Sequence, residues 1–187
     1  FTILYMLTIL LMEKKDKEIY KGLSDTDALT GLFNRRAFQA AVDETLLKRI
    51  SGVFIFIDVD NFKDYNDKYG HANGDLCLKH FAAAMKKCFP KDSILGRYGG
   101  DEFVVYIKNA ASDDAHRYMD EFQREISHLM MSGGEHVTVS ASAGGVAFIG
   151  GGEDFVSLCR SADNMLYDVK RLSLIHISEP TRHAQIS

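Results

Sequence analysis

The sequence has no run of Lys and Arg long enough to follow a phosphate backbone, and its formal net charge is −4. Both features argue against a groove that binds nucleic acid. Its only cysteines are Cys77, Cys88 and Cys159, and no C-x-x-C spacing indicates a zinc or redox site. We therefore expect free, buried thiols in a reducing compartment. The pattern G-x-x-x-x-G-K-[ST] is also absent, which excludes a Walker-type NTPase.

What the sequence contains is enough apolar residues for one domain with short appendages. It has 187 residues, of which 46% are hydrophobic, so a full core can form. The chain begins with Phe and is interpreted as a fragment. Residues 1–12 are almost wholly apolar, but a membrane-spanning helix needs about 20 residues. We interpret them as the end of a transmembrane helix, with the lysines at 14–17 as its cytoplasmic flank. A short apolar helix packed on a partner is the alternative.

Residues 13–24 are expected to form a helical connector, and a catalytic domain is expected over residues 25–171. The residues after 171 have no helical or strand period that continues the domain. Residues 172–187 resemble the translation of a sequencing-library adapter, so we expect a non-native tail that plays no part in the fold. An unusual natural tail is the alternative.

The central stretch is 97–103, which is predicted to be the tip of a β-hairpin because β-branched and aromatic residues flank it on both sides. Gly99 and Gly100 are expected to supply the positive φ angles of a tight turn. Asp101 and Glu102 follow directly. Two adjacent carboxylates beside glycines suggest a metal and phosphate site, whereas a charged hairpin tip is the plain alternative.

The remaining pattern predicts an α/β sandwich, with helices flanking one mixed sheet. Apolar residues 53–57 indicate a strand buried on both faces, and it ends at Asp58-Val59-Asp60. Asn34 is predicted to cap the first helix. The other elements are expected as a helix from Asn34 to Leu46, a helix from Gly74 to Pro90, a helix over 112–131, a strand over 137–148 and a helix over 154–170.

Carboxylates at the ends of neighbouring strands predict a shared cation site. Backbones of paired strands lie about 4.8 Å apart, so Asp58 and Asp101 would come close together if the hairpin lies beside the buried strand. Mg²⁺ prefers such oxygen ligands together with substrate phosphates and water. Two Mg²⁺ ions would polarise an α-phosphate and activate an attacking hydroxyl. The residues therefore indicate metal-dependent nucleotidyl transfer.

Four motifs also resemble the GGDEF domain of bacterial diguanylate cyclases, in the family's order and spacing. They are D-x-L-T-G-L-x-N-R-R at 27–36, D-V-D-x-F-K-x-x-N-D-x-x-G-H-x-x-G-D at 58–75, R-Y-G-G-D-E-F at 97–103 and A-D-x-x-L-Y-x-x-K at 162–170. The resemblance implies a fold like that of nucleotide cyclases and the polymerase palm. It also implies the joining of two GTP molecules into cyclic di-GMP, with release of two pyrophosphates.

The resemblance further implies a role for each residue of the site. Asp58, the carbonyl of Val59 and Asp101 would hold two Mg²⁺ ions, or Mn²⁺, and Asp101 would be the base for the 3′-hydroxyl. The other roles are assigned as follows: Glu102 supports the metal and hydroxyl, Gly99 and Gly100 let the triphosphate approach, Asn66 and Asp75 read guanine, His71 lines the substrate site, and Lys63 and Lys170 neutralise phosphate charge.

Some residues keep a structural alternative. Asp60 shares a face with Asp58, and we leave it out of the site because it is equally suited to structural hydrogen bonds. Arg35 and Arg36 are expected either to touch substrate or to form salt bridges. Many family members carry an R-x-x-D product-inhibition site, whose positions fall here on Pro90 and Ser93, so we expect no tight feedback inhibition unless Asp92 takes part. The family's last edge strand and a phosphate-binding Arg would be lost in the tail.

The resulting hypothesis is a diguanylate cyclase that works as a homodimer, because each domain holds one GTP and each 3′-hydroxyl must attack the other nucleotide. The catalytic domain would face the cytoplasm at the bacterial inner membrane. The alternative is a catalytically silent GGDEF domain that binds GTP or a partner protein as a sensor. The intact Gly-Gly-Asp-Glu sequence favours the enzyme.

Overall fold

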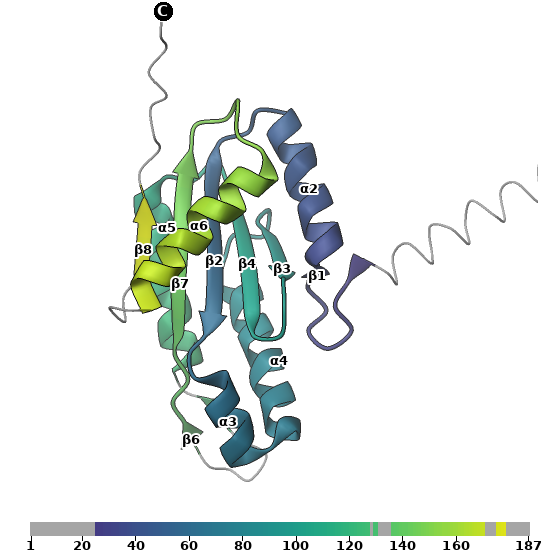
Figure 1. Ribbon diagram of the computed structural model, residues 1–187, viewed down its shortest axis with the longest axis vertical. Helices are drawn as coiled ribbons and strands as arrows, with labels where there is room; N and C mark the ends of the chain where they lie inside the picture. The colour runs from purple at the N-terminus through teal and green to yellow at the C-terminus, as the bar shows by residue number, and fades with distance from the viewer. Residues whose placement is uncertain (1–24, 128, 131–135, 171–174, 179–187) are drawn as a thin grey trace, which may run out of the picture.

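The computed structural model describes residues 25–127, 129–130, 136–170 and 175–178. These residues form a six-stranded mixed sheet with helices on both faces, and a separate two-stranded sheet (Figure 1). The predicted α/β sandwich is confirmed. The helices are α2 (Arg35–Leu47), α3 (Phe62–Tyr69), α4 (His71–Cys88), α5 (Ser112–Ile126) and α6 (Phe155–Lys170). The strands are β1 (Phe33–Asn34), β2 (Gly52–Val59), β3 (Ile94–Arg97), β4 (Glu102–Lys108), β5 (Leu129–Met130), β6 (His136–Val137), β7 (Ala141–Phe148) and β8 (Ile175–Ser178).

Strand β2 is the centre of the large sheet, whose order is β1-β3-β4-β2-β7-β8. Every residue of β2 is buried, as predicted for a strand covered on both faces. It runs antiparallel to β4 and to β7. In this register Asp58 lies opposite Glu102 on one side and opposite Ser142 on the other. The sheet thus brings the predicted hairpin directly beside the strand that carries Asp58.

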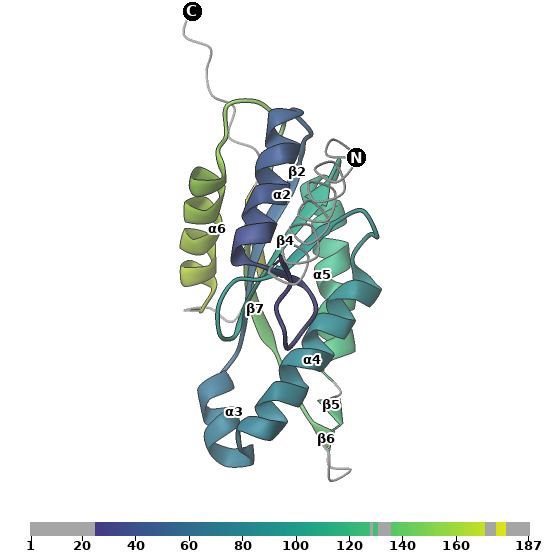
Figure 2. The same cartoon turned by 90° about the vertical axis from the view of Figure 1, so that its right-hand side faces the viewer.

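The two faces of the sheet are covered by different helix pairs, and successive residues of β2 alternate between them. Figure 2 shows α4 and α5 on one side of the sheet, and α2 and α6 on the other. Ile55 and Ile57 pack with residues of α4 and α5, whereas Phe54 and Phe56 pack with residues of α2 and α6. Asp58 follows the second set, so its side chain points to the face that α6 covers.

Helix α6 lies very close to β7 because Gly144 has no side chain. A Cβ at Gly144 would lie 2.2 Å from the backbone nitrogen of Leu166 and 2.4 Å from the carbonyl oxygen of Ala162. Both distances are far below van der Waals contact. A larger residue would therefore push the helix off the sheet and displace Lys170, which is the last residue of α6.

Several predicted boundaries are wrong. The helix expected from Gly74 begins at His71, because Gly70 takes a φ of 81° and separates it from α3. The helix expected over 112–131 ends at Ile126, where the Ser127 hydroxyl donates to the carbonyl of Arg124. The single strand expected over 137–148 is divided into β6 and β7. Asn34 does cap α2, since its side chain accepts from the amide of Ala37.

The tail contributes a strand that was not expected. Residues 175–178 form β8, which pairs parallel with β7 at the sheet edge. The expected loss of a last edge strand is therefore wrong, because strand pairing uses backbone groups and needs no particular side-chain period. The non-native origin of residues 172–187 stays a prediction. Within the described ranges, no helix combines the length and apolarity that crossing a membrane requires, and residues 1–12 lie outside those ranges.

Candidate active site

Three carboxylates gather where β2 and β4 end. Asp58 and Glu102 are paired across the two strands, and Asp101 immediately precedes Glu102. Asp58 is buried, with 9% of its surface exposed, whereas Asp101 and Glu102 are half-buried. The amide of Val59 donates to the carbonyl of Asp101 over 3.1 Å, which ties the end of β2 to the hairpin tip. The structure thus brings together the acidic residues that the sequence predicted for the site.

Lys170 completes this cluster from the end of α6. Its Nζ lies 2.9 Å from Oδ1 of Asp58. Burial raises the pKa of Asp58 above its ordinary value, while the hydrogen bond and charge of Lys170 oppose the shift. The charges of Asp101 and Asp60 raise the pKa further. Lys170 therefore supplies a positive charge to a buried acid whose other neighbours are negative.

Glu102 is also in an unfavourable environment for a negative charge. Burial raises its pKa, and the charges of Asp58 and Asp101 add to this effect. Lys170 lowers the pKa, and Asp163 of α6 raises it. Neighbouring carboxylates raise one another's pKa because their negative charges repel. A bound cation would relieve this repulsion.

The donor set fits the small number of protein ligands that Mg²⁺ takes beside substrate phosphates. Asp58 and Asp101 offer carboxylate oxygens, and Val59, which directly follows Asp58, is hydrogen-bonded to Asp101 through its amide. Within the part of the chain that the structure describes, no group of three or more His, Cys, Asp or Glu residues is arranged to hold a metal ion by itself. An open site with few protein ligands is compatible with a metal that arrives together with a nucleotide.

A cavity of about 880 Å³ opens beside Asp58 and Lys170. Ligand pockets in proteins span roughly 300–1,000 Å³. The cavity is also lined by Asp60 and Ser142 near the sheet and by His116 and Asp120 of α5. Asp58 and Lys170 therefore line a space large enough for a small-molecule substrate.

The hairpin tip differs in one respect from its prediction. Neither Gly99 nor Gly100 has a positive φ, so the proposed reason for these glycines was wrong. A Cβ at Gly99 would lie 2.4 Å from Oε2 of Glu102, whereas a Cβ at Gly100 would meet nothing within 4 Å. A side chain at position 99 would therefore displace the Glu102 carboxylate from its present place, whereas position 100 is open.

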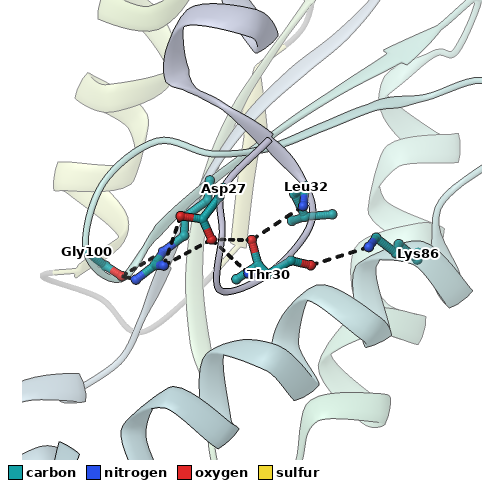
Figure 3. A network of polar contacts seen from close by, with 6 residues as sticks. Asp27, Thr30, Leu32, Lys86 and Gly100 are labelled. Carbon is teal, nitrogen blue, oxygen red and sulfur yellow. Dashed lines mark hydrogen bonds and ion pairs between the residues drawn. The ribbon is translucent and has the colours of Figure 1, made fainter. Parts of the chain in front are cut away.

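An ion pair that was not predicted connects the tip to the turn at residues 27–30 (Figure 3). Arg97 donates to both carboxylate oxygens of Asp27 at 3.1 and 3.2 Å, and also to the carbonyl of Gly100. Oδ1 of Asp27 also accepts from the amide and hydroxyl of Thr30. Both ends of the ion pair lie in sequence motifs, but only the fold shows that they meet.

The two arginines at the start of α2 make structural contacts. Arg36 forms a salt bridge with Asp25, and the guanidinium of Arg35 lies 4.4 Å from the centre of the Tyr98 ring. The salt-bridge alternative is therefore confirmed for Arg36. Arg35 instead stacks on a residue of the hairpin.

The predicted guanine-reading residues lie on the two helices of the α3–α4 hairpin, which extends past the end of β2 (Figure 1). A Cβ at Gly74 would lie 1.9 Å from Oδ1 of Asn66, so the Asn66 side chain rests directly on Gly74, next to Asp75. Oδ1 of Asn66 is buried and has no hydrogen-bond partner. A buried polar atom without a protein partner is free to accept a hydrogen bond from a ligand or a water. Lys63 and His71 are exposed on the same helical hairpin.

Comparisons with known proteins identify the family and the fold. A family described as "Diguanylate cyclase, GGDEF domain" matches residues 24–173. The chain belongs to the GGDEF family. It is 31% identical over 162 residues to the diguanylate cyclase DgcM of Escherichia coli, covering 84% of this chain and 39% of DgcM. It is 32% identical over 161 residues to the cyclic di-GMP phosphodiesterase PdeR of the same species, covering 84% of this chain and 24% of PdeR.

A solved structure has the same fold. The diguanylate cyclase SiaD of Pseudomonas aeruginosa, crystallised with its activator SiaC, superposes with a TM-score of 0.79 at 29% identity. The match covers 93% of this chain and 69% of SiaD. The GGDEF chain spans about a quarter to a half of the length of the curated relatives that it matches. The relatives include diguanylate cyclases. This is the activity that the resemblance of the motifs implied for the family.

Proposed function

We propose that this GGDEF domain is a diguanylate cyclase that condenses two GTP molecules into cyclic di-GMP and two pyrophosphates. The observation that supports this most is the cluster of Asp58, Asp101 and Glu102 at the ends of two paired strands, with Lys170 beside it. Such a cluster suits a reaction in which charge must be neutralised on a triphosphate.

The reaction requires two matching attacks. The 3′-hydroxyl oxygen of one GTP forms a bond to the α-phosphorus of the other, and the bond from that phosphorus to pyrophosphate breaks. Asp101 takes the proton of the hydroxyl, and Glu102 supports the same group from the neighbouring position. Bound Mg²⁺ would polarise the α-phosphate and favour the ionised hydroxyl. Lys170 and Lys63 neutralise the leaving pyrophosphate, while Asn66 and Asp75 orient guanine.

We propose that two copies of the chain carry out this reaction together. One domain offers one cluster of carboxylates and one pair of guanine-reading residues. The second GTP must therefore be presented by a second copy that faces the first. Dilution of the protein should then lower the specific activity, since the active species is a dimer.

The experiment is incubation of the full chain with GTP and Mg²⁺, followed by chromatography. We expect cyclic di-GMP from the wild type and none from Asp101→Ala, which should keep its circular dichroism spectrum. Asp113→Ala, which removes an exposed acid of α5, serves as the matched control and should retain activity. Retained activity in Asp101→Ala would refute the metal and base assignment.

The competing function is a silent domain that binds GTP without reacting. The relative PdeR, whose name records a phosphodiesterase, is as similar to this chain as DgcM is. Absence of cyclic di-GMP from a folded wild type that binds GTP would refute the cyclase and support the sensor.

We also propose that the domain acts at the cytoplasmic face of the inner membrane. The support is the apolar sequence of residues 1–12 and the lysines that follow it. Expression in bacteria of the parent protein, with the residues that its gene encodes before Phe1, and separation of membranes from cytosol tests this proposal. Recovery of the parent protein in the cytosolic fraction would contradict it.

A further inference from the structure

Asp60 is held by the start of β7 through three hydrogen bonds. One carboxylate oxygen accepts from the hydroxyl of Ser140 at 2.6 Å, and the other accepts from the hydroxyl of Ser142 at 2.7 Å. The amide of Asp60 donates to the carbonyl of Ser140 over 3.0 Å. This confirms the structural alternative for Asp60. We name the three residues the Ser140–Asp60–Ser142 clamp.

The backbone hydrogen bond from Asp60 to Ser140 sets the direction of the peptide between Val59 and Asp60, and the two serine hydroxyls on the Asp60 carboxylate brace that bond. A trans peptide is planar, and its C=O points opposite to its N–H. Because the N–H of Asp60 is directed to Ser140 of the β7 segment, the carbonyl of Val59 is directed to the other side of β2. That side carries β4 and the hairpin tip with Asp101. The Val59 carbonyl was assigned to the metal on resemblance alone, and the clamp gives it an orientation.

A second backbone hydrogen bond holds the end of β2 on the side of β4. The amide of Val59 donates to the carbonyl of Asp101, so the backbone after Asp58 is held from both neighbouring strands. Ser142 also lies directly opposite Asp58 in the β2–β7 register and is buried. The clamp therefore acts on the backbone on which Asp58 and Val59 are mounted.

We propose that Asp60 is a positioning residue of the metal site, which acts through Ser140 and Ser142 to hold the Val59 carbonyl toward Asp101 and does not itself bind the ion. This inference rests on the proposed function, because that function assigns the metal to Asp58, Val59 and Asp101. It concerns the geometry of the metal ligands and leaves the chemistry of the reaction unchanged.

The experiment measures Mn²⁺ binding to the full chain by electron paramagnetic resonance, in the presence of 3′-deoxy-GTP, which has no attacking hydroxyl. Outer residues that orient metal ligands typically contribute about 10–100-fold to metal affinity. We expect a loss of this size in Asp60→Ala and in the double variant Ser140→Ala/Ser142→Ala. The triple variant should lose little more, because the three residues act as one unit.

Asp60→Asn separates positioning from direct metal binding. An asparagine side chain can still form hydrogen bonds with both serines but carries no charge. We expect Asp60→Asn to bind Mn²⁺ nearly as well as the wild type. Asp64→Ala, which removes an exposed acid in the first turn of α3, is the charge-matched control and should be unchanged.

Two results would overturn the proposal. Equal losses in Asp60→Asn and Asp60→Ala would mean that Asp60 acts through its charge as a metal ligand. Unchanged Mn²⁺ affinity in the serine double variant, with a normal thermal unfolding curve, would mean that the clamp does not position the site. The serine pair decides the question if Asp60→Ala does not fold. Wild-type protein that binds Mn²⁺ but makes no cyclic di-GMP would refute the cyclase and leave the clamp intact.

Discussion

Nζ of Lys170 lies 2.9 Å from Oδ1 of Asp58, so a lysine ammonium is bound to the carboxylate that is assigned to Mg²⁺. A divalent cation and Lys170 therefore compete for the same acid. Arrival of a nucleotide would favour the exchange, because a triphosphate offers Lys170 an alternative partner and brings further oxygen ligands for the metal.

Replacement of Lys170 by Met should separate these two effects. Without nucleotide, Mn²⁺ should bind more tightly than to the wild type, since the competing ammonium is gone. With 3′-deoxy-GTP, nucleotide affinity should fall, since a phosphate partner is lost. Titration calorimetry measures both, with the exposed Lys91→Met as the control. Weaker Mn²⁺ binding in the absence of nucleotide would contradict the competition.

Glu102 should make the metal-free protein less stable at neutral pH than in mild acid. Its pKa is raised in the folded state, first by burial and then by Asp58 and Asp101. A raised carboxyl pKa contributes stability below the unfolded-state pKa, and this contribution is lost as the pH rises through the folded-state pKa. Glu102→Gln should therefore increase stability at pH 7 by about 1 kcal/mol, or roughly 2–4 °C in Tm.

The measurement is thermal unfolding with a chelator at pH 7 and near pH 4. The gain from Glu102→Gln should be smaller at the lower pH, where the wild-type acid is protonated. Glu121→Gln, at an exposed position of α5, is the matched control. A loss of stability at both pH values would contradict the electrostatic explanation.

Asp27 should have the opposite pH dependence. Burial raises its pKa, but the hydrogen bonds from Thr30 and Arg97 outweigh burial and hold the pKa below its ordinary value. The corresponding stability is present above the unfolded-state pKa and is lost as the pH falls through the folded-state pKa. Asp27→Asn should cost about 1–2 kcal/mol at pH 7, because it removes a charge-assisted hydrogen bond.

Urea unfolding at pH 7 and at pH 3 tests this effect. The difference between wild type and Asp27→Asn should shrink at pH 3, which lies below the ordinary pKa of the unfolded-state carboxyl. The exposed Asp113→Asn provides the control. A difference that is the same at both values would show that charge is not the source of the stability.

Gly74 should be required for guanine recognition although it cannot itself contact the base through a side chain. A Cβ at this position would overlap the amide of Asn66, which can rotate away without unfolding the helix. Gly74→Ala should therefore raise the KM for GTP while leaving the Tm nearly unchanged. Asn66→Ala should have the same effect, and the double variant should add little. Additive increases in KM would show that the two residues act separately.

Much of the site was predictable because its residues lie at the ends of clear patterns. The apolar residues before Asp58 could only be a buried strand, and the hairpin around Gly99 was marked by β-branched residues on both arms. Cys77 is a free, buried cysteine, as expected from the cysteine spacing, and burial raises the pKa of its thiol. In each case the local sequence decides the local structure.

The unpredicted features depend on contacts between distant segments or on backbone angles. The partner of Arg97 lies in a turn near the start of the domain, and the serines that hold Asp60 lie near the start of β7. The start of α4 depends on the positive φ of Gly70, whereas Gly99 has no positive φ and leaves space that the Glu102 carboxylate occupies. The spacing of apolar residues along the sequence does not reveal such contacts or backbone angles.

The contact of α6 with Gly144 limits how this domain can be regulated. A helix whose backbone touches a strand at van der Waals distance cannot slide without breaking that contact, so Lys170 stays fixed relative to β7. Internal rearrangement is then a costly way to switch the site. In the proposed dimeric reaction, a change in the distance or angle between two copies would alter how often their sites meet without any rearrangement inside a copy.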